Sequence, residues 1–166
     1  MIIIRDEKPE DFQQVYRVNL LAFEREDEAK LVEKLRKNEL YFSLVAETDG
    51  QIVGHISFTP VTVENEKTTF AGLAPLAVLP KFQNQGIGLK LTEEGLKTAA
   101  AKGFTAVFVL GHPTYYPRFG FETAKLKGFS CEYPSPDEAF MVLELEKGAL
   151  TEKKGLVKYC PEFAEL

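Results

Sequence analysis

The chain is 166 residues long, with 45% hydrophobic and 27% charged residues and a formal net charge of −5 at pH 7. This length suits one folded unit with a core of its own, so we expect a single domain over residues 1–166. No apolar run approaches the length of a membrane span, and the first ten residues lack a signal peptide's apolar region. The negative charge, without a cluster of lysines and arginines, argues against nucleic-acid binding. We therefore expect a cytoplasmic protein that contacts neither membranes nor nucleic acids.

The chain has only two cysteines and two histidines. Cys131 and Cys160 lie too far from either histidine in the sequence to suggest a zinc site, so we expect no metal. In a cytoplasmic protein the two cysteines are most simply free thiols.

The first forty residues predict a strand followed by two helices. Ile2–Arg5 is a short β-branched run. Pro9, followed by two acidic residues, marks a helix start, because proline fits the first turn and acids favour the positive end of the helix dipole. Apolar residues recur with helical spacing between Phe12 and Phe23. A charged loop then leads into a second helix whose apolar face includes Leu31, Val32 and Leu35.

Two hairpins are predicted next. The runs 44–48 and 52–58 flank Asp49-Gly50, which is typical of a two-residue hairpin turn. We expect Pro60 to end or bend the second of these strands. A further hairpin, with its turn near residues 64–67, then leads into a central strand.

That central stretch, Leu73–Gly103, predicts a strand, a turn and a helix. Residues 73–79 form a continuous apolar run, which predicts a strand covered on both faces. Pro75 cannot donate a ladder hydrogen bond, so one edge of the strand is expected to be open or bulged there. Residues 83–88 carry two glycines and turn the chain into a helix with a small inner face, which Gly103 ends.

Two glycines at a helix start favour an anion, because the backbone can approach it closely and the first N–H groups of the helix are unpaired. A pyrophosphate is the anion that we expect. A P-loop is excluded because no Lys-Ser/Thr pair follows the glycines. A dinucleotide fingerprint is excluded because Leu91 occupies the position of its third glycine.

The remainder of the chain predicts strands joined by turns. Residues 104–110 form another buried strand, and Gly111-His112-Pro113 forms a turn. A short helical stretch is expected over Tyr115–Phe119, with a further strand opening at Phe121. The run 140–145 is expected to be the last strand.

Two motifs carry a resemblance to a known family. The turn 83–88 fits Gln/Arg-x-x-Gly-x-Gly/Ala after a strand, and Tyr116–Phe121 fits Tyr-x-x-x-Gly-Phe about thirty residues later. In this order and spacing the chain resembles the GCN5-related N-acetyltransferases (GNAT). Residues 76–80 and 115–121, together with the tail 155–163, resemble in particular their YhbS-like predicted-acetyltransferase branch. The resemblance implies an α/β fold in the order β-α-α-β-β-β-α-β-α-β, with a twisted mixed sheet and helices on both faces.

The resemblance also implies which residues meet acetyl-coenzyme A. The pantetheine arm would pair with the strand backbone, and one strand N–H would stabilise the developing oxyanion. The pyrophosphate would lie on the N–H groups of the glycine turn. The implied coenzyme-binding residues are Leu76, Ala77, Val78, Gln83, Asn84, Gln85, Gly86, Ile87, Gly88 and Gly111.

The same resemblance implies a tyrosine that protonates the departing thiolate. Tyr116 lies four residues before Gly120, where the family carries this residue. Its neighbour Tyr115 is the alternative. Packing of both rings at a sheet edge is the purely structural interpretation.

A general base is harder to identify. Many relatives place a carboxylate on the central strand, but residues 73–79 contain none. His55 and His112 are candidates by chemistry, since a neutral imidazole titrates in the right range. His55 lies on a predicted strand, where a structural role is the alternative. Three glutamates at positions 24, 26 and 28 could reach an amine, or could form a solvated charged loop.

We therefore expect an N-acetyltransferase that moves an acetyl group from acetyl-coenzyme A to a primary amine of a small molecule or peptide. The alternative is a coenzyme-binding regulatory module with little or no catalysis. The negative charge mildly favours cationic amines, and the family's members often form homodimers.

Overall fold

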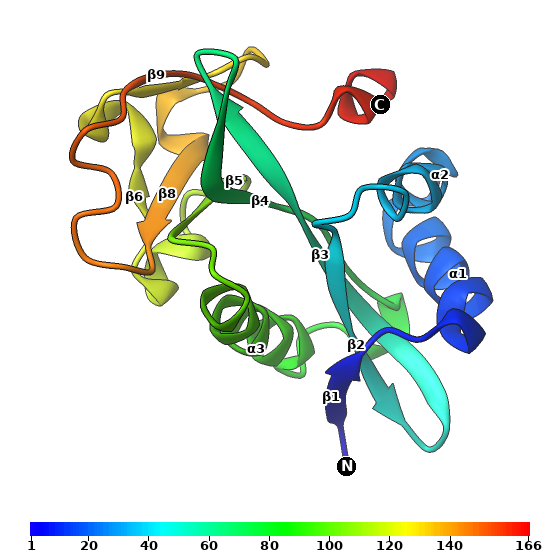
Figure 1. Ribbon diagram of the computed structural model, residues 1–166. Helices are drawn as coiled ribbons and strands as arrows, with labels where there is room; N and C mark the ends of the chain where they lie inside the picture. The colour runs from blue at the N-terminus through cyan, green and yellow to red at the C-terminus, as the bar shows by residue number, and fades with distance from the viewer. The chain divides into compact units, whose positions relative to one another are not determined.

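The computed structural model describes all 166 residues and has the predicted mixed α/β architecture (Figure 1). Its strands are β1 (Ile3–Asp6), β2 (Phe42–Thr48), β3 (Gln51–Val63), β4 (Glu66–Val78), β5 (Ala106–Leu110), β6 (Glu122–Thr123), β7 (Phe129–Cys131), β8 (Phe140–Glu144) and β9 (Gly155–Lys158). Its α-helices are α1 (Phe12–Phe23), α2 (Asp27–Leu35) and α3 (Ile87–Ala101). None of these helices is both long and apolar enough to cross a membrane. Both cysteines are free thiols.

The chain forms two compact units that are each made of several segments. The first unit contains residues 1–59, 74–95 and 162–166. The second contains residues 60–73 and 96–161. The expectation of one domain over residues 1–166 stays a prediction.

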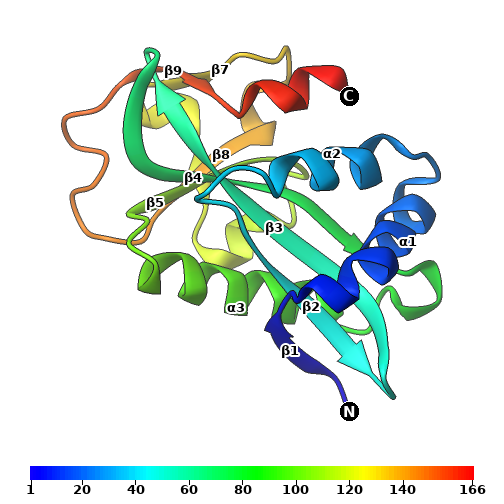
Figure 2. The ribbon, with the colours of Figure 1, turned by 45° about the vertical axis from the view of Figure 1, so that its right-hand side comes forward.

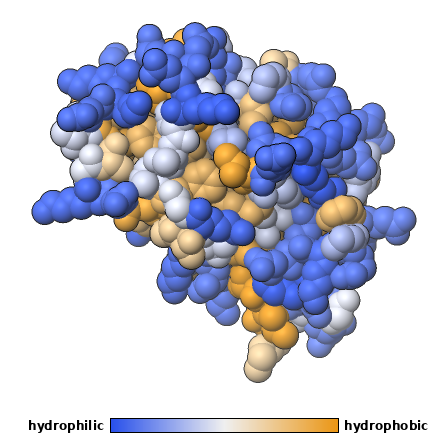
Figure 3. Space-filling model, in the orientation of Figure 1, coloured by the Kyte–Doolittle hydropathy of each residue, from blue (hydrophilic) through white to orange (hydrophobic).

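The first unit is built on three antiparallel strands, β1, β2 and β3. Val45 on β2 lies opposite Arg5 on β1 and opposite His55 on β3. The β2–β3 turn has the positive φ angles that its sequence predicts, 50° at Asp49 and 75° at Gly50. The outer strand β1 is partly exposed: Figure 3 shows apolar colour at the lower end of the molecule, and 51% of Ile3 is exposed.

Helices cover both faces of this part of the sheet (Figure 2). Alternate strand residues point to opposite faces, so β3 shows which helix lies on which side. His55 contacts Asn19 of α1. Its neighbour Gly54 faces α3, and a Cβ there would lie 2.9 Å from Cδ1 of Leu91. Gly95 of α3 similarly leaves room for the ring of Phe58, as the predicted small inner face of the helix requires.

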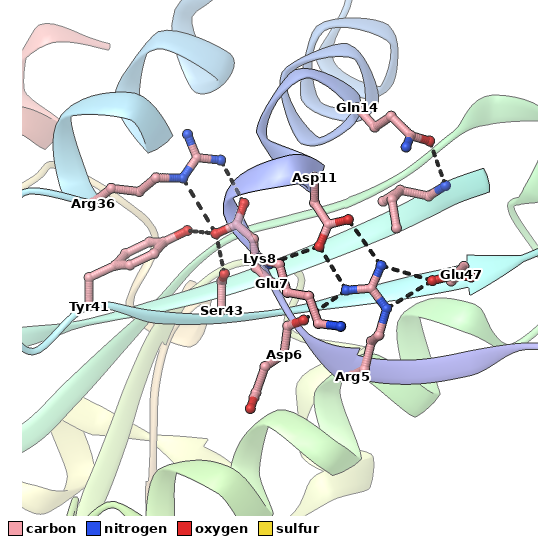
Figure 4. A network of polar contacts seen from close by, with 11 residues as sticks. Arg5, Asp6, Glu7, Lys8, Asp11, Gln14, Arg36, Tyr41, Ser43 and Glu47 are labelled. Carbon is pink, nitrogen blue, oxygen red and sulfur yellow. Dashed lines mark hydrogen bonds and ion pairs between the residues drawn. The ribbon is translucent and has the colours of Figure 1, made fainter. Parts of the chain in front are cut away.

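The connection from β1 into α1 is held by an ion-pair network (Figure 4). Pro9 opens a 3₁₀ turn that continues as α1. Asp11 accepts the Lys8 backbone N–H at 2.8 Å and the Arg5 guanidinium at 2.7 Å. Arg5 also donates to Glu47 on β2 at 2.8 Å. The predicted helix start is therefore confirmed, with a 3₁₀ first turn.

The second unit combines parallel and antiparallel strands. The first part of β4 pairs in parallel with β5, and β5 pairs antiparallel with β8, which also pairs with β6. The end of β3 pairs with β9, and β9 pairs in parallel with β7. A cluster of phenylalanines fills the core of this unit: the ring centroid of Phe108 lies 5.1 Å from that of Phe129 and 5.5 Å from that of Phe140.

Two expectations about the elements were wrong, and a third was wrong in part. Pro60 does not end its strand, because proline removes only one ladder donor and β3 continues to Val63; a bend at Pro60 stays a prediction. The run 140–145 is not the last strand, since β9 follows it. The α-helix that the family order implies before the last strand is not formed. The short helical stretch expected over Tyr115–Phe119 is confirmed as a 3₁₀ turn at Tyr116–Phe119, and a second 3₁₀ turn follows at Ala124–Lys127.

Candidate functional site

The end of β4 presents a half-exposed apolar face, which corrects the expectation of a strand covered on both faces. Pro75, Ala77 and Leu79 are buried, whereas Leu76 and Val78 are only half-buried. The Leu79 N–H donates to the Val53 carbonyl of β3 at 2.9 Å. The β4–β5 register covers only Phe70–Gly72, so the backbone edge of residues 76–78 on that side carries no paired strand and can accept an extended ligand.

The turn after β4 is exposed and is shaped by positive φ angles. Asn84 has φ 61° and Gly86 has φ 82°. The Lys90 N–H donates to the Gly86 carbonyl at 3.1 Å, so Gly86 precedes the first turn of α3. The N–H groups of this first turn, including that of Ile87, have no partner within the helix. A Cβ on Gly86 would meet no atom within 4 Å, so the space around it is open.

Two glutamine side chains hold this turn. The Gln83 amide donates to the Val78 carbonyl at 3.0 Å, and the Gln85 amide donates to the Lys81 carbonyl at 3.2 Å. These side chains therefore brace the turn. Its first backbone N–H, that of Gln83, also donates to the Pro80 carbonyl, at 3.4 Å. An exposed turn with open glycine space at a helix N-terminus fits a phosphate group.

The second unit brings Gly111, Tyr115 and Tyr116 together. The Tyr116 ring is 8% exposed and makes edge contacts with the rings of Tyr115 and Phe121, at centroid distances of 4.9 and 5.6 Å. A Cβ on Gly111 would lie 2.6 Å from Cε2 of Tyr116, so any residue other than glycine at position 111 would clash with this ring. The Gly111 backbone therefore packs directly against the Tyr116 ring.

Burial keeps the Tyr116 hydroxyl protonated. Desolvation raises the pKa of Tyr116 above its ordinary value, and the nearby Tyr115 raises it further. The hydroxyl oxygen of Tyr115 is also buried, and no group of the protein hydrogen-bonds to it. The Arg118 guanidinium lies 4.7 Å from the centroid of the Tyr115 ring. Both tyrosines are therefore held by packing, and Tyr115 stays the alternative.

His55 is fully buried in the first unit, and its hydrogen bonds define its protonation. The Asn19 side-chain nitrogen lies 3.0 Å from the Val15 carbonyl oxygen, which only accepts, so this atom must be the amide nitrogen. The same nitrogen lies 3.2 Å from Nδ1 of His55. Burial lowers the pKa of His55 to about 4, so the ring is neutral at pH 7. Nδ1 therefore accepts and Nε2 carries the proton.

This tautomer leaves His55 no available lone pair, because the only one is engaged by Asn19. The arrangement favours the structural interpretation of His55 over that of a base. His112 is exposed, in the turn before Tyr115. It belongs to the second unit, as do both tyrosines.

The charged segment that links α1 to α2 is only partly exposed to solvent. Glu26 is exposed and pairs with Lys30 at 2.8 Å, as expected of such a loop. Glu28 is buried, however, and accepts the Arg25 guanidinium at 2.8 Å. A carboxylate that is already paired with an arginine is a poor proton acceptor. Glu28 is therefore better explained as a residue that stabilises the start of α2 than as the general base.

Sequence reasoning missed a buried polar cluster around Glu7 (Figure 4). The Glu7 carboxylate accepts hydrogen bonds from Arg36 at 2.6 Å, Tyr41 at 2.9 Å and Ser43 at 2.6 Å. Burial alone would raise the pKa of Glu7, but the Arg36 and Ser43 hydrogen bonds help to hold it below its ordinary value. Glu7 directly follows β1, Arg36 directly follows α2, Tyr41 directly precedes β2 and Ser43 lies at its start, so no local motif links them.

Comparison with known proteins identifies the family. The family model described as "Acetyltransferase (GNAT) domain" matches residues 3–124. The chain is 40% identical over 164 residues to the "Uncharacterized N-acetyltransferase YhbS" of Escherichia coli (strain K12), covering 98% of each chain. It is 42% identical over 134 residues to the "Uncharacterized N-acetyltransferase YjhQ" of the same strain, covering 77% of this chain and 74% of that protein.

Solved structures agree with this result. The crystal structure of the Escherichia coli GNAT family N-acetyltransferase YhbS in complex with CoA has a TM-score of 0.93 and 39% identity, covering 98% of this chain and 92% of that one. A GNAT family acetyltransferase from Brucella melitensis in complex with acetyl-CoA has a TM-score of 0.83 and 34% identity, covering 98% of both chains. These findings confirm the resemblance drawn from the two motifs. The chain belongs to the GNAT family of N-acetyltransferases.

Proposed function

We propose that this acetyltransferase moves an acetyl group from acetyl-coenzyme A to a primary amine of a small molecule or peptide. The observation that carries the proposal is the turn before α3. Gly86 combines a φ of 82° with open space, directly before unpaired helix N–H groups. Two relatives of this fold are in complex with CoA or acetyl-CoA, which supports the same ligand for this turn.

In this proposal the backbone of the first unit holds the co-substrate. The N–H groups from Gln83 to Gly88 would bind the pyrophosphate, and the half-exposed strand residues 76–78 would pair with the pantetheine arm. One strand N–H would stabilise the negative charge that develops on the thioester oxygen. Removing such a donor typically costs about 10²–10³-fold in rate.

The reaction that these groups serve is direct attack by the neutral amine. The amine nitrogen bonds to the thioester carbonyl carbon, and the carbon–sulfur bond then breaks. We assign to Tyr116 the proton that the departing thiolate takes up, since its hydroxyl remains protonated at neutral pH. The proton lost by the nitrogen leaves through water and restores the tyrosine, so one proton in total passes from amine to thiol.

The alternative is a module that binds acetyl-coenzyme A with little or no catalysis, because residues 73–79 hold no carboxylate base. Thiol release separates the two functions: the protein is mixed with acetyl-coenzyme A and a panel of amines, and the free thiol is measured. Release with at least one amine supports the enzyme. Coenzyme binding by calorimetry without release from any amine favours the module. A homodimer and a cytoplasmic location remain predictions.

The missing base predicts how the rate depends on the amine. Without a strong base, the rate should follow the neutral fraction of the acceptor. At pH 7 an amine with a pKa of about 10.4 is neutral to about four parts in ten thousand, whereas one near 8 is neutral to about a tenth. We therefore expect kcat/KM at pH 7 to favour the less basic amine by roughly 200-fold, and to rise with pH towards the acceptor's pKa.

The measurement is kcat/KM from pH 6 to pH 10 for a series of amines of similar size. A plateau beginning near pH 6.5 for every amine would instead show a protein base. Its loss in His112→Ala would identify His112 as that base. A base with the lowered pKa of His55, about 4, would instead keep the rate level over the whole measured range, and His55→Ala would remove that level profile.

A further inference from the structure

The buried face of β3 contains a serine whose partner lies on β4. Ser57 is fully buried, and its hydroxyl donates to the Ala74 carbonyl oxygen at 2.8 Å. Both residues belong to the first unit. Ala74 stands two residues before the strand segment 76–78 that is proposed to pair with the coenzyme.

The Ser57 hydrogen bond is important because of the composition of the Ala74–Pro75 peptide unit. Proline has no N–H, so the Ala74 carbonyl is the only hydrogen-bonding group of that peptide unit. Pro75 therefore supplies no backbone N–H to the β-ladder at this point of β4. The Ser57 side chain of β3 donates a hydrogen bond to the Ala74 carbonyl, which is the group that remains. Ala74 is half-buried, between the fully buried Ser57 hydroxyl and the buried Pro75, so leaving its carbonyl unpaired would be costly.

From this geometry we infer that Ser57 is a positioning residue for acetyl transfer, which rests on the proposed function. Its hydroxyl fixes the Ala74 carbonyl, and through it the direction in which the peptide groups of residues 76–78 point. Those peptide groups carry the proposed oxyanion donor. A misplacement of about 1 Å in such a group can cost roughly 10²-fold in rate. Ser57 itself is buried and acts only through β4.

The opposite strand offers a matched control. Ser43 on β2 lies directly opposite Ser57 in the β2–β3 register and is also buried. Its hydroxyl donates in the other direction, to the Glu7 carboxylate at 2.6 Å (Figure 4). Ser57→Ala and Ser43→Ala therefore remove the same atom from the same face of the sheet, but only the first releases β4.

The test compares these variants with the wild type in a thiol-release assay, using an amine that the wild type acetylates. We expect Ser57→Ala to lower kcat by about tenfold or more while the KM for the amine changes less than about twofold. Ser43→Ala should change neither constant by more than about twofold. Ser57→Thr keeps the hydroxyl and should restore at least half of the lost activity on a logarithmic scale. Urea unfolding checks that each variant is folded under the assay conditions.

Equal kcat values for Ser57→Ala and Ser43→Ala would overturn the positioning role and leave the proposed function standing. If the extra methyl group of Ser57→Thr prevents folding, the comparison of the two alanine variants still decides the matter. If the wild type releases no thiol with any amine, the proposed function fails, and the inference about Ser57 fails with it.

Discussion

Two segments that carry the family motifs use glycine for opposite reasons. In the turn 83–88 the backbone is exposed, and a Cβ on Gly86 would meet nothing within 4 Å. Before Tyr116 the backbone is crowded, and a Cβ on Gly111 would lie 2.6 Å from the tyrosine ring. Gly86 is needed because its φ is 82°, whereas Gly111 is needed because a ring occupies the space.

The difference indicates what each segment can do. The turn offers backbone N–H groups to a ligand, so changes there should alter affinity. The tyrosine segment offers side chains locked by aromatic packing, so changes there should alter the rate of a chemical step. Separate effects on affinity and on rate are therefore the expected signature of the two segments.

The largest effect is expected for Tyr116→Phe. This substitution keeps the ring and its contacts and removes only the hydroxyl, so folding should be nearly unchanged. If the hydroxyl protonates the thiolate, kcat should fall by roughly 10²-fold, with little change in affinity for acetyl-coenzyme A. Steady-state kinetics and calorimetry measure the two quantities.

Tyr115→Phe is the matched control for Tyr116→Phe, because the neighbouring hydroxyl is also buried. Its kcat should stay within a few-fold of the wild type. A loss confined to Tyr115→Phe would show that the acid is the neighbouring tyrosine. No loss in either variant would assign the proton to water.

A smaller effect, on affinity, is expected for Gly86→Val. The side chain has room, but a β-branched residue at φ 82° is strained, and its Cβ stands where a phosphate should meet the backbone. Calorimetry should show acetyl-coenzyme A binding weakened by tenfold or more, which is about 1.4 kcal/mol. Gly103→Val is a control at another helix end with positive φ, and it should leave affinity unchanged. Unchanged affinity in Gly86→Val would remove the turn from the site.

The contrast also separates what the sequence could predict from what it could not. The turn 83–88 and the Asp49-Gly50 hairpin were predicted because local residues determine backbone shape. The Ser57–Ala74 hydrogen bond joins residues 17 positions apart, and the Ser43–Glu7 bond joins residues 36 apart. Which residues form these long-range hydrogen bonds depends on strand register, and no local sequence pattern predicts that register. The short strands β7 and β9 were missed because three or four residues show too little alternation.

A several-fold effect on rate is expected for Gly111→Ala. The added methyl group must displace the Tyr116 ring, because the two would be 2.6 Å apart. We expect kcat to fall by about threefold to tenfold, since the hydroxyl moves with the ring. Affinity for acetyl-coenzyme A should not change. A loss of affinity instead would support the direct coenzyme contact that the family resemblance implies for Gly111.

The smallest effect on activity is expected for His55, whose titration should change stability and not the rate. Burial lowers the pKa of His55, with Glu7 opposing the shift and Arg36 adding to it. The folded pKa is about 4 and the unfolded value is 6.5, so between these pH values the unfolded chain binds more protons. Stability from this residue is therefore complete above pH 6.5 and is lost as the pH falls towards 4.

Urea unfolding at several pH values from 7 to 4.5 measures this loss, which we expect to reach about 1–3 kcal/mol. His55→Gln cannot take up the proton, so its stability should vary less with pH between 6.5 and 5. The carboxylates of Glu7 and Asp11 do not confuse the comparison, because their pKa values are lowered and they titrate at more acidic pH. Equal pH slopes for the wild type and His55→Gln over that interval would show that His55 is not held neutral. The argument that its only lone pair is engaged by Asn19 would then fail, and His55 would return as a candidate base.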